Sequence, residues 1–202
     1  LKPAVAYVIL TVVLLLIFLI VGYPAFIAVF AHLNPFKFAK KITRVAVFGF
    51  STSSSAATLP LNVKTTVEEL GVDEKIASFV LPLGMTINMN GTAIMQVIAT
   101  LFIAGCAGYQ ISFTQLVVIA LLALIASAGT PAAPGSGAII LFTILSGLGY
   151  VNDAAMLAYS LILAINRPIE MLVTALNVVG DSATSIYVAK SEGALNEDVY
   201  NA

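Results

Sequence analysis

Charged residues are scarce in this chain of 202 residues. Only 9% of them are Asp, Glu, Lys or Arg, whereas 60% are hydrophobic. A soluble domain carries about 25% charged residues, so the composition predicts a chain embedded in membrane lipid. The formal net charge is −1 and no basic patch is present, which argues against a nucleic-acid partner.

Other residue types that are scarce or absent also limit the possible kinds of protein. The chain has one cysteine, Cys106, so an intrachain disulfide is excluded, and we expect a small core residue there. It begins without Met and without a cleavable signal pattern, which suggests a piece of a larger protein. No Lys or Arg occurs between residues 76 and 166, as expected for loops on the outer side of a membrane. Lys37, Lys40, Lys41 and Arg44 instead form a compact cluster, which we expect in a cytoplasmic loop.

Apolar segments divide the chain, and two of them predict spanning helices. Residues 4–33 exceed the roughly 20 residues that cross a bilayer, and Gly22 and Pro24 should kink the second half of that helix. Residues 76–107 are also long enough to cross, but Asn, Thr and Gly side chains interrupt them from Thr86 to Thr92. We therefore expect a transmembrane helix that is unwound in its middle.

Two further segments fit re-entrant hairpins better than crossing helices. Residues 45–61 lie between two charged loops and contain a run of hydroxyl side chains at 51–55. Residues 112–149 contain a stretch rich in Pro and Gly at 129–137, which cannot remain helical. Irregular backbone at membrane depth is tolerated only where it is buried in protein or lines an aqueous cavity. Each segment should therefore enter and leave on one side of the membrane.

The last apolar segment carries a polar stripe. Residues 153–190 are expected to form one final transmembrane helix, followed by a loose polar tail at 191–202. Polar side chains recur along this helix in steps of four, four, three and four, which places them on one face. Two carboxylates on that face are costly in lipid, so the face should meet protein, water or ions. The stripe consists of Asn166, Glu170, Thr174, Asn177 and Asp181.

The order of these segments predicts the fold class. A spanning helix and a hairpin are followed by a broken helix, a second hairpin and a final helix, and the basic residues place the two hairpins on opposite sides. We therefore expect an all-α membrane protein, an inverted-repeat transporter with two re-entrant helical hairpins and broken transmembrane helices. On this interpretation residues 1–202 form a partial transport domain.

Several motifs resemble one known family. Ser53 to Pro60, Asn88 to Thr92 and Asn177 to Asp181 resemble, in order, motifs of the glutamate/aspartate transporter family, the dicarboxylate/amino-acid:cation symporters. The Gly129 to Gly137 stretch is similar to the tip of that family's second hairpin. The resemblance covers the C-terminal half of such a protein. It implies a multi-pass protein of the plasma membrane, a homotrimer whose transport domains move like elevators, and cation-coupled symport of an amino acid or dicarboxylate.

The resemblance also implies roles for particular residues. The expected substrate-binding residues are Ser54, Ser55, Thr92, Pro134, Gly135, Arg167, Glu170, Val173, Thr174 and Asn177. One expected cation site uses Gly84, Asn88, Asn177 and Asp181, and a second uses backbone carbonyls near Thr86, Ser127, Ala128 and Thr130. Asn90 stands at a third cation site, where the family commonly has an aspartate.

Departures from the family pattern leave the substrate and the coupling ion open. Members selective for acidic substrates usually have an arginine at the position of Val173 or of Ser53, so a neutral amino acid is an alternative. Arg167 could reach a substrate carboxylate, but we expect it to pair with Glu170 three residues later. Sodium suits the oxygen-rich sites. A proton carried by Glu170 is the alternative, because a charged carboxylate in lipid is costly.

Two other classes of protein, an intramembrane protease and a channel, fit the sequence less well. An intramembrane protease would need a second aspartate, or a histidine base beside Ser136, and the only histidine, His32, lies at a helix end. We therefore do not expect an enzyme. A channel lined by broken helices is the third possibility, and it would lack saturable, cation-dependent uptake. The sequence therefore favours a secondary active transporter.

Overall fold

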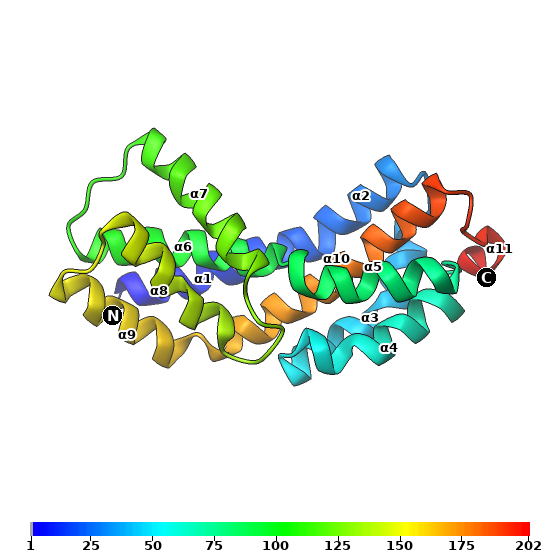
Figure 1. Cartoon of the computed structure of the whole chain (residues 1–202), viewed down its shortest axis with the longest axis horizontal. Coiled ribbons are helices and arrows are strands. Elements are labelled where there is room, and N and C mark those ends of the chain that lie inside the picture. Colours follow the sequence, from blue (N-terminus) through cyan, green and yellow to red (C-terminus); the bar gives the residue numbers. More distant parts are fainter. Residues whose placement is uncertain (1) are drawn as a thin grey trace.

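The computed structural model describes residues 2–202 of the chain, and this part is helical almost throughout (Figure 1). No β-strand is found in it, and Val72 and Leu195 form an isolated antiparallel bridge. This agrees with the predicted all-α membrane protein. The elements, in chain order, are α1 Lys2–Ile17, the π-helix η1 Phe18–Gly22, α2 Tyr23–Phe30, α3 Pro35–Thr52, α4 Ser55–Glu68, α5 Glu74–Ile87, α6 Asn90–Cys106, α7 Phe113–Ala128, α8 Ser136–Leu148, α9 Asp153–Ile165, α10 Arg167–Ser191 and α11 Glu197–Asn201.

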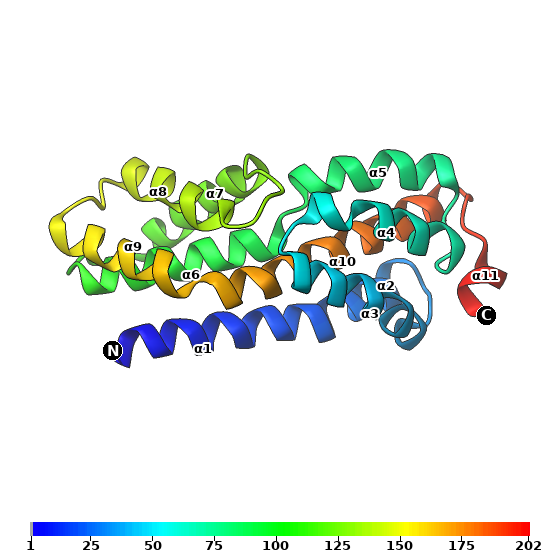
Figure 2. The same cartoon turned by 90° about the horizontal axis from the view of Figure 1, so that it is seen from below.

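Helix α10 lies at the centre of the molecule, and α1 to α6 all pack against it (Figure 2). Its residues from Leu172 to Ala183 are buried without a gap. A helix that is buried on all faces cannot send its polar groups into solvent, so these groups must bond to neighbouring helices. The predicted polar stripe therefore points into protein.

Three helical segments of the described chain are long and apolar enough to cross a membrane: Pro3–Phe30, Glu74–Cys106 and Arg167–Ser191. The first includes a π-helical turn, in which the Tyr23 amide donates to the Phe18 carbonyl. Pro24 has no N–H to donate, so a normal helical hydrogen bond is missing at the same place. The predicted interruption of this helix therefore takes the form of a π-bulge.

The first hairpin consists of α3 and α4, which pack against each other. It begins earlier than the expected 45–61, and the basic cluster lies in α3 rather than in a loop. Asn34 explains the early start, because its side chain accepts hydrogen bonds from the Phe36 and Lys37 amides, and Pro35 occupies the first turn. The expectation of a basic loop was wrong.

Helices α5 and α6 are separated only by Asn88 and Met89, so the break is narrower than the predicted 86–92. Cys106, at the end of α6, is exposed rather than buried in the core. The second hairpin, α7 and α8, turns at Gly129 to Gly135, and Gly135 has a φ of 83°. Only glycine adopts this left-handed conformation without strain.

The last segment differs from its prediction in two ways. Instead of one helix over 153–190, α9 and α10 meet at Asn166, because Pro168 in the first turn of α10 lacks the N–H that would continue the helix. The tail is not loose. Helix α11 buries Tyr200 completely, and the Tyr200 hydroxyl donates to the Asn34 carbonyl at 2.8 Å. Two expectations, an unbroken final helix and a free tail, were therefore wrong.

Candidate functional site

The tips of the two hairpins meet near the middle of the molecule (Figure 1). The Ser54 hydroxyl donates to the Ala132 carbonyl at 2.9 Å, and the Ala56 amide reaches the same oxygen at 3.5 Å. Ser54 also caps α4, because its side chain accepts from the Ala57 amide. Two segments separated by 78 positions in the sequence are thus joined directly.

A small cavity of about 30 Å³ lies between these tips, α6 and α10. This volume is well below the range of about 300–1,000 Å³ for sites that hold small molecules, so a solute fits only if the tips move apart. The cavity walls combine hydroxyl, amide and backbone groups and one carboxylate with the apolar side chains of Met89, Met95 and Val173. The lining residues are Ser53, Ser55, Met89, Thr92, Met95, Thr130, Pro131, Ala132, Ala133, Gly135, Ser136, Gly137, Glu170, Val173, Thr174 and Asn177.

Three helices begin at the wall of this cavity: α4, α6 and α8. The amides of a first helical turn have no partner within the helix and carry partial positive charge. The first turn of α8 has no side-chain cap at Gly135. In addition, the Ser53 hydroxyl is buried with no hydrogen-bond partner. Several first-turn amides are already bonded, among them those of Ala57, Gly91 and Ala138. The Ser53 hydroxyl and the remaining amides are the donors left for an anionic group such as a carboxylate.

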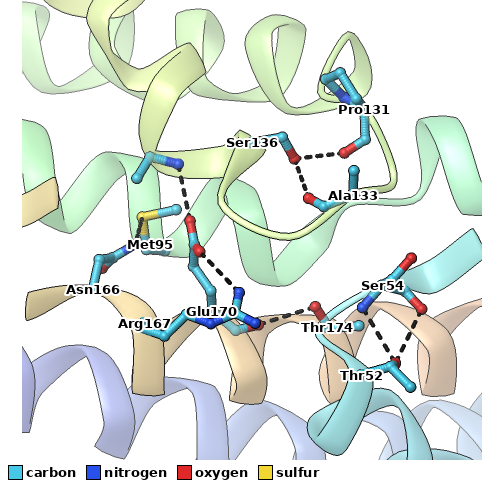
Figure 3. A network of polar contacts seen from close by, with 11 residues as sticks. Thr52, Ser54, Met95, Pro131, Ala133, Ser136, Asn166, Arg167, Glu170 and Thr174 are labelled. Carbon is cyan, nitrogen blue, oxygen red and sulfur yellow. Dashed lines mark hydrogen bonds and ion pairs between the residues drawn. The ribbon is translucent and has the colours of Figure 1, made fainter. Parts of the chain in front are cut away.

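Glu170 supplies the carboxylate of the cavity (Figure 3). One of its oxygens accepts a hydrogen bond of 3.2 Å from the Ala138 amide in the first turn of α8. The other lies 3.9 Å from Arg167, whose side chain is 55% exposed. The predicted ion pair between Arg167 and Glu170 is therefore present. Arg167 does not line the cavity, and Glu170 links α10 to the second hairpin.

Asp181 and two other residues of the first expected cation site lie together. The Asn88 side-chain amide donates to the Asp181 carboxylate at 2.9 Å. A Cβ atom added to Gly84 would lie 2.6 Å from the Asp181 Oδ1 atom, so only glycine lets α5 approach so closely. Carboxylate, amide and carbonyl oxygens of this kind suit a hard cation, and a turn of the Asn88 amide would direct its oxygen to the same place.

Asn177 lies on the same face of α10 but bonds at the break between α5 and α6. Its side-chain oxygen accepts from the Gly91 amide at 2.8 Å, and its side-chain nitrogen donates to the Thr92 hydroxyl at 3.1 Å. Asn177 thus caps α6 while lining the cavity. Along α10 it lies between Glu170, which lines the cavity, and Asp181.

The side chains of the second expected cation site bond to nearby carbonyls rather than to one another. The Thr86 and Ser127 hydroxyls donate to the Leu83 and Leu124 carbonyls within α5 and α7, and the Thr130 hydroxyl, two residues beyond α7, donates to the Ala126 carbonyl. These bonds hold the C-terminal ends of α5 and α7, whose carbonyls are the groups that the resemblance implies as ligands.

The structure thus gathers most of the predicted substrate residues around the cavity: Ser55, Thr92, Gly135, Glu170, Val173, Thr174 and Asn177. Ser54, Pro134 and Arg167 are outside its lining, although Ser54 fastens the two tips together. Sequence reasoning did not assign Met89, Met95 or the Ser53 hydroxyl to the site. The position of Met95, one helical turn after Thr92, was the available signal for that residue.

Comparisons with known proteins assign the chain to a family. A profile of the Sodium:dicarboxylate symporter family matches residues 1–191. Excitatory amino acid transporter 1 of Homo sapiens is 34% identical over 87% of this chain and 32% of its own length. An excitatory amino acid transporter of Caenorhabditis elegans and one of Onchocerca volvulus are each 35% identical over 81% of the chain and 32% of their own lengths.

The chain spans about a third of the length of these relatives. The match includes both hairpins, the cavity and the Asp181 cluster. Symporters bind and release their solutes without catalytic chemistry, in line with the expectation that the chain is not an enzyme. The chain belongs to the sodium:dicarboxylate symporter family.

Proposed function

We propose that this chain binds substrate and cation in a secondary active transporter that couples sodium entry to the uptake of a small amino acid. The observation that carries the proposal is the cavity between the two joined hairpin tips, with Asp181, Asn88 and Gly84 clustered nearby. Family membership supports sodium as the coupling ion and a small carboxylate-bearing solute as the substrate.

The chemistry of the cavity favours a zwitterion. A substrate carboxylate would accept hydrogen bonds from the first turns of α4 and α8, and a substrate ammonium would pair with Glu170. No Lys or Arg lines the cavity in the described chain, and Val173 stands where a basic partner for a second carboxylate would be expected. A neutral amino acid therefore fits better than aspartate or a dicarboxylate.

Sodium fits the site better than a proton. Glu170 accepts a hydrogen bond from a backbone amide and lies 3.9 Å from Arg167, so both of its oxygens already have partners in the protein. The Asp181 cluster offers oxygen ligands that suit a small hard cation. Glu170 then serves as the partner of the substrate ammonium.

The joined tips suggest how access is controlled. The second hairpin is held by bonds to Ser54 of the first hairpin, Glu170 of α10 and Gln96 of α6, and release of these bonds would open the cavity on the side of α7 and α8. Sodium and substrate together would favour the closed form, because each would contribute differential affinity for it. We further propose an elevator movement of this domain in a homotrimer of the plasma membrane, as the resemblance implies.

Calorimetric titration of the purified protein tests the proposal. Alanine, serine, aspartate and succinate are titrated separately, with sodium and with choline in its place. We expect alanine or serine to bind only in sodium, and aspartate and succinate to bind at least tenfold more weakly. Tighter binding of succinate than of alanine, or equal affinity in choline, would contradict it.

A further inference from the structure

Tyr23 reaches the Asp181 cluster from a helix to which no role has been assigned. It is the first residue of α2, directly after the π-helical turn, and it is 6% exposed. Its ring packs edge-on against Phe18, with 5.1 Å between the ring centroids. Its hydroxyl accepts a hydrogen bond of 3.1 Å from the Asn90 side-chain amide. π-bulges are frequent at functional sites, and this one directs a phenol toward buried polar groups.

The contact is the first of a continuous chain of hydrogen bonds. Asn90 also donates to the Asn88 side-chain oxygen at 3.0 Å, and Asn88 donates to Asp181 at 2.9 Å. The members come from α2, α6, the break after α5, and α10. The orientation of one amide therefore sets the orientation of the next, as far as the Asp181 carboxylate.

Gly180 makes room for this chain of hydrogen bonds. A Cβ atom there would lie 2.7 Å from the Tyr23 ring carbon that carries the hydroxyl, and 3.0 Å from the Asn88 amide nitrogen. Neither neighbour can move away without breaking its hydrogen bond. The glycine beside Asp181 is thus explained by the approach of Tyr23 and Asn88, rather than by a turn, since it lies inside α10.

We propose that Tyr23 is a positioning residue for the cation site, holding the Asn90 and Asn88 amides so that they can turn together when an ion binds Asp181. The inference rests on the proposed function, because it assumes that Asp181 contributes to a sodium site. Tyr23 itself does not touch the ion. It acts through Asn90 and Asn88.

The reason for a phenol at this place is that a hydroxyl both accepts and donates. In the structure, the Asn88 NH₂ group donates to Asp181, and the Asn90 NH₂ group donates both to Asn88 and to Tyr23. When Asn88 turns its oxygen to a cation, its NH₂ group faces Asn90, which must turn as well. Tyr23 can then donate to the Asn90 oxygen, so no polar group of this hydrogen-bond network loses its partner.

A purely structural role would need only the ring. Phenylalanine would make the same edge-on contact with Phe18, but it could neither accept from nor donate to Asn90. Because a phenol donates more strongly than it accepts, loss of the hydroxyl should disfavour the turned, cation-bound arrangement more than the arrangement seen here. Loss of one hydrogen bond of about 1 kcal/mol corresponds to roughly a fivefold change in affinity.

The test compares Tyr23→Phe with Tyr187→Phe, which removes a phenol that is 42% exposed and packs against α2 from α10. Sodium is titrated by calorimetry without substrate, and the melting temperature is measured in sodium and in choline. We expect Tyr23→Phe to weaken sodium binding roughly three- to tenfold and to reduce the sodium-induced rise in melting temperature. Tyr187→Phe should match the wild type in both.

A double-mutant cycle adds a second measurement. Tyr23→Phe combined with Asn90→Ala should weaken sodium binding no more than Asn90→Ala alone, since the hydroxyl acts through that amide. Additive effects would overturn the relay, and so would unchanged sodium affinity in Tyr23→Phe. Absence of sodium binding in the wild type would overturn the proposed function, and this inference with it. The two failures are therefore distinguishable.

Discussion

Asp181 combines features that single side chains in a membrane rarely share. It is 2% exposed, lies inside the most buried helix, and has the Asn88 amide as its hydrogen-bond partner. A buried carboxylate with so few donors is costly unless a cation joins it. At the residue scale this is the strongest structural support for a cation site.

Asp181→Asn should remove the sodium dependence of substrate binding while leaving the protein folded, because an amide keeps the shape of the carboxylate but not its charge. Calorimetric titration of alanine in sodium and in choline measures the effect. Asp153→Asn, at the exposed start of α9, is the matched control and should behave as the wild type. Undiminished sodium dependence in Asp181→Asn would place the cation elsewhere.

Glu170→Gln should weaken amino-acid binding by at least tenfold, because the ammonium loses its anion while the hydrogen bond to the Ala138 amide can persist. The measurement is the substrate affinity at saturating sodium. Glu192→Gln, beyond the end of α10, serves as the control for loss of a carboxylate. Full affinity in Glu170→Gln would indicate a substrate without an amino group.

The C-terminal segment is the clearest feature at the element scale. The Lys41 ammonium donates to the carbonyls of Glu69, Val199 and Tyr200 at 2.8 to 2.9 Å, so it caps the ends of α4 and α11 together. Lys37 bonds the Asn201 carbonyl beside it. These bonds fasten the base of the first hairpin, whereas at the base of the second the Tyr109 hydroxyl donates to the Gly149 carbonyl at 3.3 Å.

Lys41→Met should lower the free energy of unfolding by about 2 kcal/mol, since three charge-assisted hydrogen bonds are lost while the apolar stem is kept. Thermal unfolding in detergent measures this, and Lys40→Met, at an exposed neighbouring position, is the control. Equal stability of the two lysine variants would show that the tail is not fastened by Lys41.

Burial raises the pKa of Tyr200 to about 12. The stabilisation that Tyr200 gives to the docked tail is therefore complete below about pH 10, and it is lost only as the pH rises through about 12.

At the scale of the whole molecule, the two hairpins approach each other from opposite ends, and their tips close the cavity (Figure 2). The side chains that bond the second tip are few, among them Ser54 from the first hairpin, Glu170 from α10 and Gln96 from α6. Few bonds at a closing surface keep the cost of opening low.

A cross-link between the tips should stop exchange of bound substrate. Ser54→Cys and Ala132→Cys, introduced together in a Cys106→Ala background, place two thiols where the tips now touch. After oxidation, we expect prebound radiolabelled alanine to remain bound, and reduction to restore exchange. Each single-cysteine variant controls for the substitutions. Unhindered exchange in the cross-linked protein would show that the tips need not separate.

Local sequence determined much of this protein. Low charge and long apolar runs specified a membrane protein, the run at 51–55 and the stretch at 129–137 marked both tips, and the spacing of the stripe placed Glu170, Thr174 and Asp181 on one face. These features depend on periodicity and backbone chemistry within a few residues, so they can be read without a fold.

Tertiary structure decided the rest. The bond from Ser54 to Ala132, the position of Tyr23 against Gly180, and the docking of Tyr200 join residues separated by 78, 157 and 166 positions, and no local pattern encodes such pairings. The tail seemed free because its polar residues resemble a solvated end, yet Lys41 offers it carbonyl partners only in the folded chain. Burial, which sets the value of each such bond, exists only once the helices have packed.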